Sequence, residues 1–390
     1  MARYAFNDLR VDEPDWGAGE LSFLETLRRG EQRALHELLP GYAKTPLCDC
    51  KDLASELGLG GLLVKDESSR YGIDAFKGLG ASWAIYSVLR ARWKKERGED
   101  LPVSLFADET LRTALGRSTF AAATDGNHGR AVAWTASMLG QDAVIFMPED
   151  TAKARISSIE GEGARVELVP GTFDDCVSRC AKVSAERGWE VIADTAYPGN
   201  MEVPGHIITG YSTIFAEIFE QTDRKIDAVF LPAGVGGLAA AGTASMVFEF
   251  GKERPRLVCV EPEECACFLE SVAKGAGEPI TAGGNHRSIM VGLCCATPSL
   301  LAWPVIRDGM DLFLAIEDDH AYEAMRAYHR HGIVSGESGS SSLAGLLALL
   351  RRQDLALARE GLGLNEKSTV LLVSTEGATD PSNYERIIAG

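Results

Sequence analysis

Short unbroken runs of apolar and β-branched residues recur along the chain, and segments with helical periodicity separate them. Such runs are typical of strands that are buried on both faces of a sheet. The predicted strands cover residues 61–67, 142–148, 164–170, 190–195, 227–234, 256–262 and 368–375. The predicted helices include residues 78–97, 129–140, 151–161, 172–188, 205–222, 236–251 and 339–353. This alternation predicts an α/β fold with largely parallel sheets, in which ligands bind at the carboxyl ends of the strands.

The composition is that of a globular protein with an acidic surface. The chain has 390 residues, enough for two domains, of which 45% are hydrophobic and 24% are charged. Its formal net charge of −17 disfavours binding to nucleic acid or to an anionic membrane. The first twenty residues hold no long apolar run, so we expect no secretory signal. Nine cysteines without zinc-ribbon spacing then indicate a cytoplasmic protein without a metal site.

Lys77 opens a helical segment a few residues after the first predicted strand. The positive end of a helix dipole disfavours a cation at this position. Forming an imine with an aldehyde cofactor would remove the charge, and lysine amines do form such Schiff bases. Considered alone, the position is explained more simply by an ordinary surface lysine.

A polar turn, Thr124-Asp125-Gly126-Asn127, precedes an amphipathic helix that runs on from Gly129. Free amide groups at a helix start, together with small polar side chains, form a site for an anion such as a substrate carboxylate. A turn that merely caps the helix is the alternative interpretation.

A glycine-rich turn at residues 234–238 joins a buried strand to an alanine-rich helix. Its glycines let the backbone close round a phosphate, and the helix start supplies free amide groups. The turn lacks the last glycine of the dinucleotide-binding pattern and the Lys-Ser/Thr pair of a P-loop. It therefore indicates a phosphate site without a nucleotide signature.

Taken in order, the motifs AFKG, TDGNHG and AGVGGLAAA resemble the lysine, the asparagine loop and the phosphate loop of fold-type II pyridoxal 5′-phosphate (PLP) enzymes. STEGATDP, at residues 374–381, resembles the segment of that superfamily that faces the pyridine nitrogen. The resemblance covers the chain from about residue 44 to residue 381. It implies two three-layer αβα domains with mainly parallel sheets and with PLP in the cleft between them.

The same resemblance assigns the residues that hold PLP. Lys77 would carry it as a Schiff base, Asn127 would bond its ring hydroxyl, and Thr375 would face the pyridine nitrogen, with Ser374 or Glu376 as alternatives. The phosphate would lie on Gly234, Val235, Gly236, Gly237 and Leu238.

Several segments, among them DESSRYGIDAFKGLG, ATDGNHGRAVAW, DTAYPGN and GESG, are similar to those of the 2,3-diaminopropionate ammonia-lyases. That family converts both enantiomers of diaminopropionate to pyruvate and ammonia, and the acids matching Asp125 and Asp194 take part in proton abstraction. The resemblance implies that Lys77, Asp125 and Asp194 are catalytic and that Thr124, Asp125 and Asp194 bind the substrate. Freed from the cofactor, Lys77 could act as the base on one face of Cα and Asp125 on the other.

Alternative functions remain open at this point. A serine/threonine dehydratase is the nearest rival, with Asp125 and the DTAYPGN stretch against it. A lyase for a larger N-substituted diamino acid and a PLP-binding regulator without turnover are further possibilities.

The resemblance also concerns the organisation of the chain. We expect a homodimer, with residues 1–89 and 200–390 in a large PLP-binding domain and residues 90–199 in a smaller inserted domain. Residues 1–43 could be an interaction segment or part of the dimer surface. A disulfide between Cys267 and Cys295 is a further hypothesis, against which a reducing compartment argues.

Overall fold

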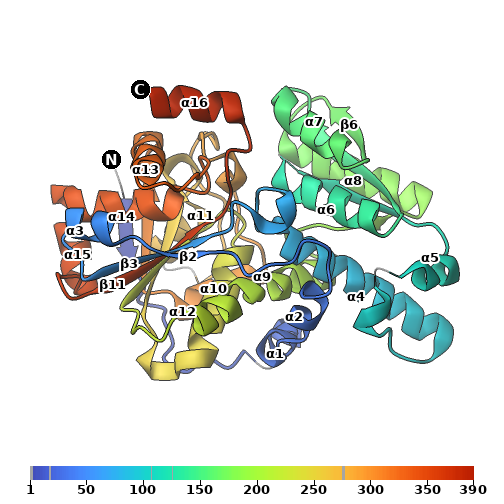
Figure 1. The fold of residues 1–390 in the computed structure, drawn as a ribbon, viewed down its shortest axis with the longest axis horizontal. Helices are drawn as coiled ribbons and strands as arrows, with labels where there is room; N and C mark the ends of the chain where they lie inside the picture. Colours follow the sequence, from blue (N-terminus) through green and yellow to red (C-terminus); the bar gives the residue numbers. More distant parts are fainter. Residues whose placement is uncertain (1–2, 17–18, 107, 125, 275–276) are drawn as a thin grey trace.

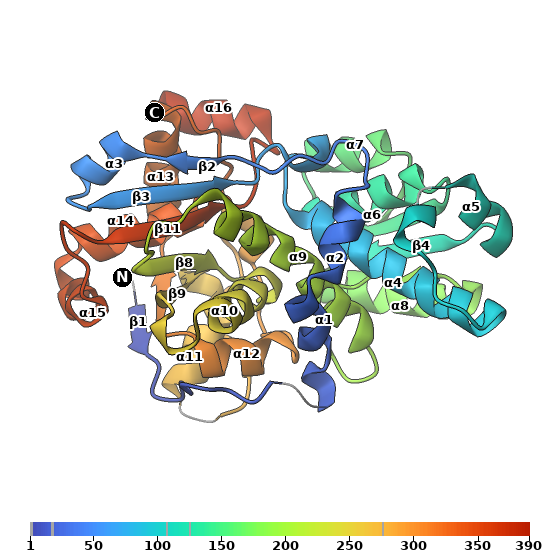
Figure 2. The same cartoon turned by 60° about the horizontal axis from the view of Figure 1, so that its bottom comes forward.

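The computed structural model describes residues 3–16, 19–106, 108–124, 126–274 and 277–390. Two β-sheets with helices on both faces make up the fold (Figures 1 and 2). The larger sheet consists of β1 (Arg3–Phe6), β2 (Leu47–Asp49), β3 (Gly61–Asp66), β8 (Ala228–Pro232), β9 (Arg256–Pro262), β10 (Leu312–Ile316) and β11 (Thr369–Ser374). The smaller sheet consists of β4 (Thr119–Ala123), β5 (Asp142–Pro148), β6 (Arg165–Val169) and β7 (Glu190–Val191).

Strand order explains where the loops of the site meet. The larger sheet has the order β1-β10-β9-β8-β11-β3-β2, with antiparallel strands only at its two edges. The smaller sheet has the order β6-β5-β4-β7 and is parallel throughout. Because β8, β11 and β3 are parallel neighbours, their carboxyl ends lie side by side. The segments that follow these three strands are therefore brought together at one edge.

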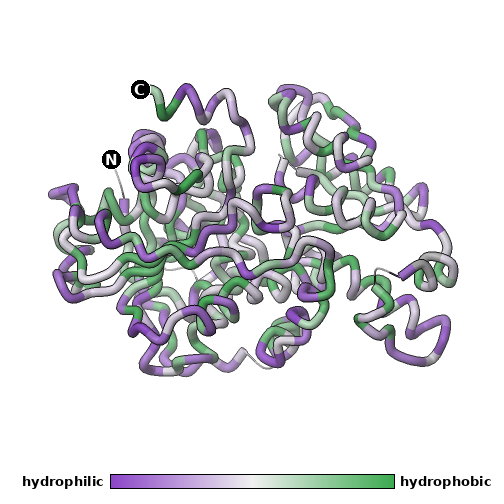
Figure 3. The backbone as a smooth tube through the Cα atoms, viewed as in Figure 1, coloured by the Kyte–Doolittle hydropathy of each residue, from purple (hydrophilic) through white to green (hydrophobic). Residues whose placement is uncertain are grey.

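Helices cover both sheets. They are α1 (Phe23–Arg29), α2 (Glu31–His36), α3 (Lys51–Glu56), α4 (Lys77–Arg97), α5 (Glu109–Leu115), α6 (Asn127–Met138), α7 (Lys153–Gly161), α8 (Phe173–Arg187), α9 (Glu202–Gln221), α10 (Gly237–Phe250), α11 (Cys267–Ala273), α12 (Ala302–Gly309), α13 (Asp318–Arg330), α14 (Ser341–Arg351), α15 (Ala356–Leu362) and α16 (Pro381–Ala389). One face of the larger sheet packs on α9, α10 and α12, and the other packs on α13 and α14 (Figures 1 and 2). Figure 3 shows the resulting pattern, with hydrophobic segments inside and hydrophilic ones on the outer turns.

Helix α4 connects the two sheets through its packing. It contacts α9 beside the larger sheet and α6 beside the smaller one. Lys77 is its first residue, so the lysine lies where the helical layers of the two sheets meet.

The predicted α/β fold with mainly parallel sheets is confirmed. All seven predicted strands and all seven predicted helices are present, although β7 is only two residues long. The sequence interpretation missed β1, β2, β4 and β10. The part of residues 1–43 that the structure describes belongs to the body of the protein. Its strand β1 pairs with β10 of the larger sheet, and the side chains of Trp16 and Leu24 are buried. Among the helices that the structure describes, none has both the length and the apolar character needed to cross a membrane.

Candidate active site

A strained turn leads from the end of β3 to Lys77. We call residues 70–76 the pre-lysine turn. Tyr71 has a φ of 54° and Asp74 a φ of 56°, a region that residues with a side chain seldom adopt. The N–H of Gly377 donates to the carbonyl of Asp74 at 2.9 Å. This bond holds the turn, and with it the start of α4, against the segment that follows β11.

Lys77 and Asp194 form an ion pair across 117 residues of sequence. Lys77 Nζ lies 2.8 Å from Asp194 Oδ2, and each side chain is 18% exposed. Burial lowers the pKa of the Lys77 ammonium, but the Asp194 charge outweighs this and holds the pKa above its ordinary value. Burial raises the pKa of Asp194, and the Lys77 charge outweighs this and holds the pKa below its ordinary value. Two residues that the sequence interpretation placed in the site are thus in direct contact, and both are charged near neutral pH.

His128 is a neutral ring beside this ion pair. Its Nε2 lies 2.6 Å from the carbonyl oxygen of Ile192, which can only accept, so Nε2 carries the proton. Burial lowers the pKa of His128, which keeps the ring neutral. Its Nδ1 lies 4.0 Å from Asp194 Oδ2. The backbone bond therefore fixes the position of the ring against Asp194.

The asparagine loop follows β4 and starts α6. Thr124 Oγ1 accepts from the N–H of Gly126 at 3.0 Å and from the N–H of Gly129 at 3.2 Å. The Thr124 hydroxyl thus caps the start of the helix, as the alternative interpretation of this turn expected. The Asn127 side-chain amide donates to the Glu376 carboxylate. Asp125 lies outside the described residues.

The segment after β11 reaches the same place. The Ser374 hydroxyl donates to Ser335 Oγ at 2.8 Å, and Glu376 Oε1 accepts from the N–H of Ser338 at 3.0 Å. Thr375 is buried, and its carbonyl accepts from the N–H of Phe76 at 3.2 Å. Its hydroxyl makes no hydrogen bond to a residue that the structure describes. Of the three candidates for the pyridine nitrogen, Thr375 alone has a side chain that the described residues leave available.

The glycine-rich turn has the shape of a phosphate site. Gly236 has a φ of +95°, and a Cβ there would lie 2.4 Å from Phe268 Cζ. A Cβ on Gly234 would lie 3.0 Å from the carbonyl oxygen of Gly292. No described side chain caps the start of the 14-residue helix α10, so its first amide groups remain available to an anion. The residues present therefore fit the phosphate that the sequence interpretation assigned to them.

Tyr211 on α9 joins the glycine-rich turn to the lysine. A Cβ on Gly237 would lie 3.3 Å from its ring, and Lys77 Nζ lies 5.8 Å from the ring centroid. The turn and the lysine thus both lie near one buried ring. Val235 and Leu238 complete the turn, and the Val235 carbonyl accepts from the N–H of Ser299 at 3.0 Å.

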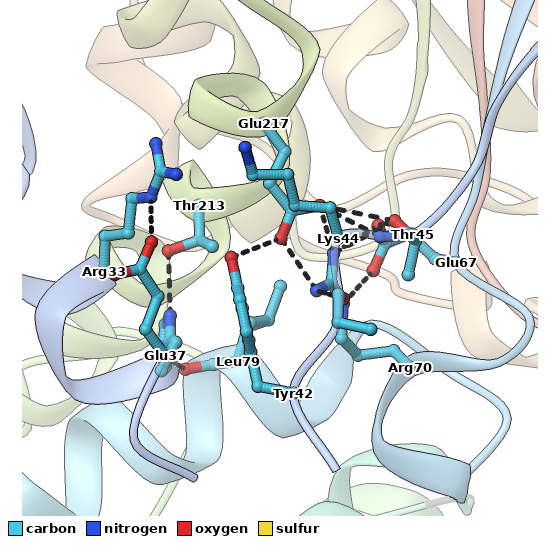
Figure 4. A network of polar contacts seen from close by, with 12 residues as sticks. Arg33, Glu37, Tyr42, Lys44, Thr45, Glu67, Arg70, Leu79, Thr213 and Glu217 are labelled. Carbon is cyan, nitrogen blue, oxygen red and sulfur yellow. Dashed lines mark hydrogen bonds and ion pairs between the residues drawn. The ribbon is translucent and has the colours of Figure 1, made fainter. Parts of the chain in front are cut away.

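A buried charge quartet, Lys65, Glu67, Arg70 and Glu217, meets the pre-lysine turn at Arg70, the first residue of the turn. Figure 4 shows Glu67, Arg70 and Glu217. All four side chains are fully buried. Glu217 accepts from Lys65 at 2.6 Å and from Arg70 at 2.8 Å, and Arg70 also pairs with Glu67 at 2.8 Å. The sequence interpretation missed this quartet. Lys65 in an apolar strand was a usable signal, because a buried charge needs a partner.

One further contact was not anticipated. Glu376 links the side chain of Asn127 to the backbone of Ser338, and no local sequence pattern predicts this role. Cys267 is a buried free thiol in the structure, so the hypothesis of a disulfide between Cys267 and Cys295 gains no support.

Comparisons with known proteins agree with this geometry. Residues 38–375 match the family model described as pyridoxal-phosphate dependent enzyme. The chain is 37% identical over 366 residues to the diaminopropionate ammonia-lyase of Escherichia coli strain K12, covering 91% of this chain and 90% of that protein.

Solved structures of the Escherichia coli enzyme are also similar. The holo form of diaminopropionate ammonia lyase superposes with a TM-score of 0.89 at 34% identity, covering 100% of this chain and 96% of that one. A complex of that enzyme with an aminoacrylate-PLP azomethine reaction intermediate has a TM-score of 0.87 at 33% identity, covering 100% and 97%. The lysine, the glycine-rich turn and these matches lead to one conclusion: the chain belongs to the pyridoxal-phosphate dependent enzymes and, within them, to the diaminopropionate ammonia-lyase family.

Proposed function

We propose that this protein is a carbon–nitrogen lyase that uses PLP to eliminate ammonia from D- and L-2,3-diaminopropionate, giving pyruvate and ammonia. The observation that carries the proposal is the buried ion pair between Lys77 and Asp194, in a chain of this family. PLP supplies an electron-withdrawing ring that acidifies the Cα–H of a bound amino acid. Lys77 is the Schiff-base residue in this proposal, with Asn127 and Thr375 at the ring and residues 234–238 at the phosphate.

Two side chains transfer protons in this proposal, and a third, Asp194, holds a charge beside the lysine. Lys77, when its amine is free, takes the proton from one face of Cα. Asp125 takes the proton from the opposite face, which would allow both enantiomers to react. Asp194 keeps its negative charge while the Lys77 ammonium lies 2.8 Å away, because that ammonium holds the pKa of Asp194 below its ordinary value.

Asp194 also favours a diamino acid over a hydroxy amino acid. The Asp194 carboxylate pairs with the Lys77 ammonium in this structure, and it would lose this partner in an enzyme in which Lys77 holds PLP. Leaving a buried carboxylate without a partner is costly. The side-chain ammonium of diaminopropionate restores a cation, whereas the hydroxyl of serine or threonine does not. This argument favours the ammonia-lyase over the dehydratase.

A substrate panel tests the proposal. The purified, PLP-loaded protein is assayed for keto-acid formation with D-diaminopropionate, L-diaminopropionate, L-serine and L-threonine. We expect both diaminopropionate enantiomers to have the highest kcat/KM. A higher kcat/KM for serine or threonine would establish the dehydratase instead.

The organisation of the protein belongs to the same proposal. We propose a cytoplasmic homodimer, which the nine cysteines of the chain and the family membership support. We also propose two domains, residues 1–89 with 200–390 and residues 90–199, since the four strands of the smaller sheet all lie within the second range. Light scattering coupled to size-exclusion chromatography tests the dimer, and a monomer at micromolar concentration would contradict it.

A further inference from the structure

The pre-lysine turn holds a conformation that it would not keep unaided. Positive φ values strain the backbone of Tyr71 and Asp74, and such residues persist only where their surroundings over-determine the backbone. The turn ends at Lys77, so whatever stabilises it also sets where the lysine begins.

On one side, the buried charge quartet holds the turn. Arg70 donates to Glu67 and to Glu217 on α9, each at 2.8 Å (Figure 4). Its guanidinium carbon also lies 6.0 Å from the centroid of the Tyr71 ring. These contacts tie the start of the turn to a helix of the larger sheet.

On the other side, α6 holds the turn through two residues one helical turn apart. Arg130 Nη1 donates to the carbonyl of Ile73 at 3.1 Å and to Asp74 Oδ2 at 3.0 Å, and its Nη2 lies 3.3 Å from the carbonyl oxygen of Gly72. Trp134 stacks on the Tyr71 ring, with centroids 4.8 Å apart and planes inclined by 24°. Both non-glycine residues of the turn that have a positive φ are therefore contacted from α6.

Helix α6 begins at Asn127, so these contacts link α6, the segment after β11 and the pre-lysine turn to one another. Asn127 donates to Glu376, the neighbouring Gly377 N–H donates to the Asp74 carbonyl, and Arg130 returns from the turn to α6. We propose that Arg130 is a positioning residue that fixes Lys77 relative to the asparagine loop. The proposal rests on the proposed function, in which Lys77 and Asn127 hold the same cofactor.

Arginine is suited to this role by its shape. Its planar fork of N–H donors can bond several acceptors at once, whereas a lysine ammonium is a compact charge on a flexible stem. The Arg130 side chain is only 18% exposed and also donates to Glu162 Oε1 at 3.1 Å. Glu162 lies outside the turn, so it offers a matched control in which the same arginine loses a different partner.

The test compares Arg130→Gln, Arg130→Lys and Glu162→Gln with the parent. Small misplacements of a reacting group can cost about 100-fold, so we expect kcat per PLP-loaded enzyme to fall by roughly 10- to 100-fold in Arg130→Gln. We expect an intermediate fall in Arg130→Lys, a KM within about threefold of the parent in all variants, and a kcat within about twofold in Glu162→Gln.

A second readout needs no substrate. PLP is mixed with cofactor-free protein, and its capture by Lys77 is followed by visible absorbance. We expect capture to be about tenfold slower in Arg130→Gln and unchanged in Glu162→Gln. If the parent fails to act on diaminopropionate, the proposed function fails, while the capture rates still decide the role of Arg130.

Two results would overturn the proposal. One is a kcat and a capture rate in Arg130→Gln within twofold of the parent. The other is a loss of thermal stability with unchanged turnover per PLP-loaded enzyme, which would make Arg130 structural only. If Arg130→Gln does not fold, Asp74→Asn replaces it, because asparagine tolerates positive φ and only the charge facing Arg130 is lost.

Discussion

Replacing Gly236 with alanine should disrupt the glycine-rich turn for two separable reasons. Its φ of +95° strains any residue with a Cβ, and that Cβ would lie 2.4 Å from Phe268 Cζ and 2.9 Å from Ile306 Cδ1. The backbone strain costs about 1–2 kcal/mol and over-packing costs about 1–3 kcal/mol, so we expect a loss of roughly 2–5 kcal/mol. Phe268 is fully buried, so its ring has little room to move away.

Gly98→Ala is the matched control. Gly98 also has a positive φ, +76°, but no described atom lies within 4 Å of the place its Cβ would occupy. It should therefore lose only the backbone part, about 1–2 kcal/mol. The free energy of unfolding is measured by urea denaturation, and PLP affinity by titration of the cofactor-free protein.

The two glycine variants should also differ in their affinity for PLP. In Gly236→Ala the first amide groups of α10 are displaced, so we expect PLP affinity to fall by about tenfold or more, the equivalent of one lost hydrogen bond to a charged group. Gly98→Ala should bind PLP as the parent does. Equal stability and equal PLP affinity in the two variants would refute the assignment of this turn to the phosphate.

Other predictions concern charge. Asp194→Asn should lower the pKa of Lys77, because burial remains while the opposing charge is lost, so PLP capture by the cofactor-free protein should shift to lower pH; an unshifted pH profile would contradict this. Glu217→Gln should cost about 3–5 kcal/mol in urea denaturation, because two buried cations lose a partner, and a loss below about 1 kcal/mol would show that the quartet contributes little. Burial raises the pKa of Glu261 to about 8. The parent should therefore lose stability relative to Glu261→Gln as the pH rises from about 5 to about 8. Parallel curves of unfolding free energy against pH for the two proteins would contradict the shift. Asp125→Asn should impair turnover of one diaminopropionate enantiomer more than the other, whereas equal losses would mean that the acid only binds charge.

The sequence could predict the interior strands because their apolar runs are long and bounded by turns. It could not predict β10, whose five buried residues lie between helices and have no period that separates strand from helix. Alanine, which is uncommon in strands, makes up most of β4, and β1 and β2 are short edge strands. In these places pairing with neighbouring strands decides the structure.

The candidate site likewise has some features that the sequence indicates and some contacts that it does not. The glycine-rich turn was singled out by its place between a strand and a helix, whereas Lys77 was singled out only by the order of the motifs along the chain. The contacts of Lys77 with Asp194 and of Asn127 with Glu376 join segments more than one hundred residues apart. Only the arrangement of the two sheets shows which of the many acidic residues becomes the partner.

The most direct test of the central claim is the behaviour of Lys77→Ala, measured beside Lys94→Ala, which removes an exposed lysine from the same helix. Each protein is incubated with PLP, its visible absorbance is recorded, and pyruvate formation from D- and L-diaminopropionate is followed. We predict that Lys77→Ala loses both the visible absorbance of the bound cofactor and the turnover, while Lys94→Ala keeps both. A Lys77→Ala protein that stays yellow and still forms pyruvate would contradict the account.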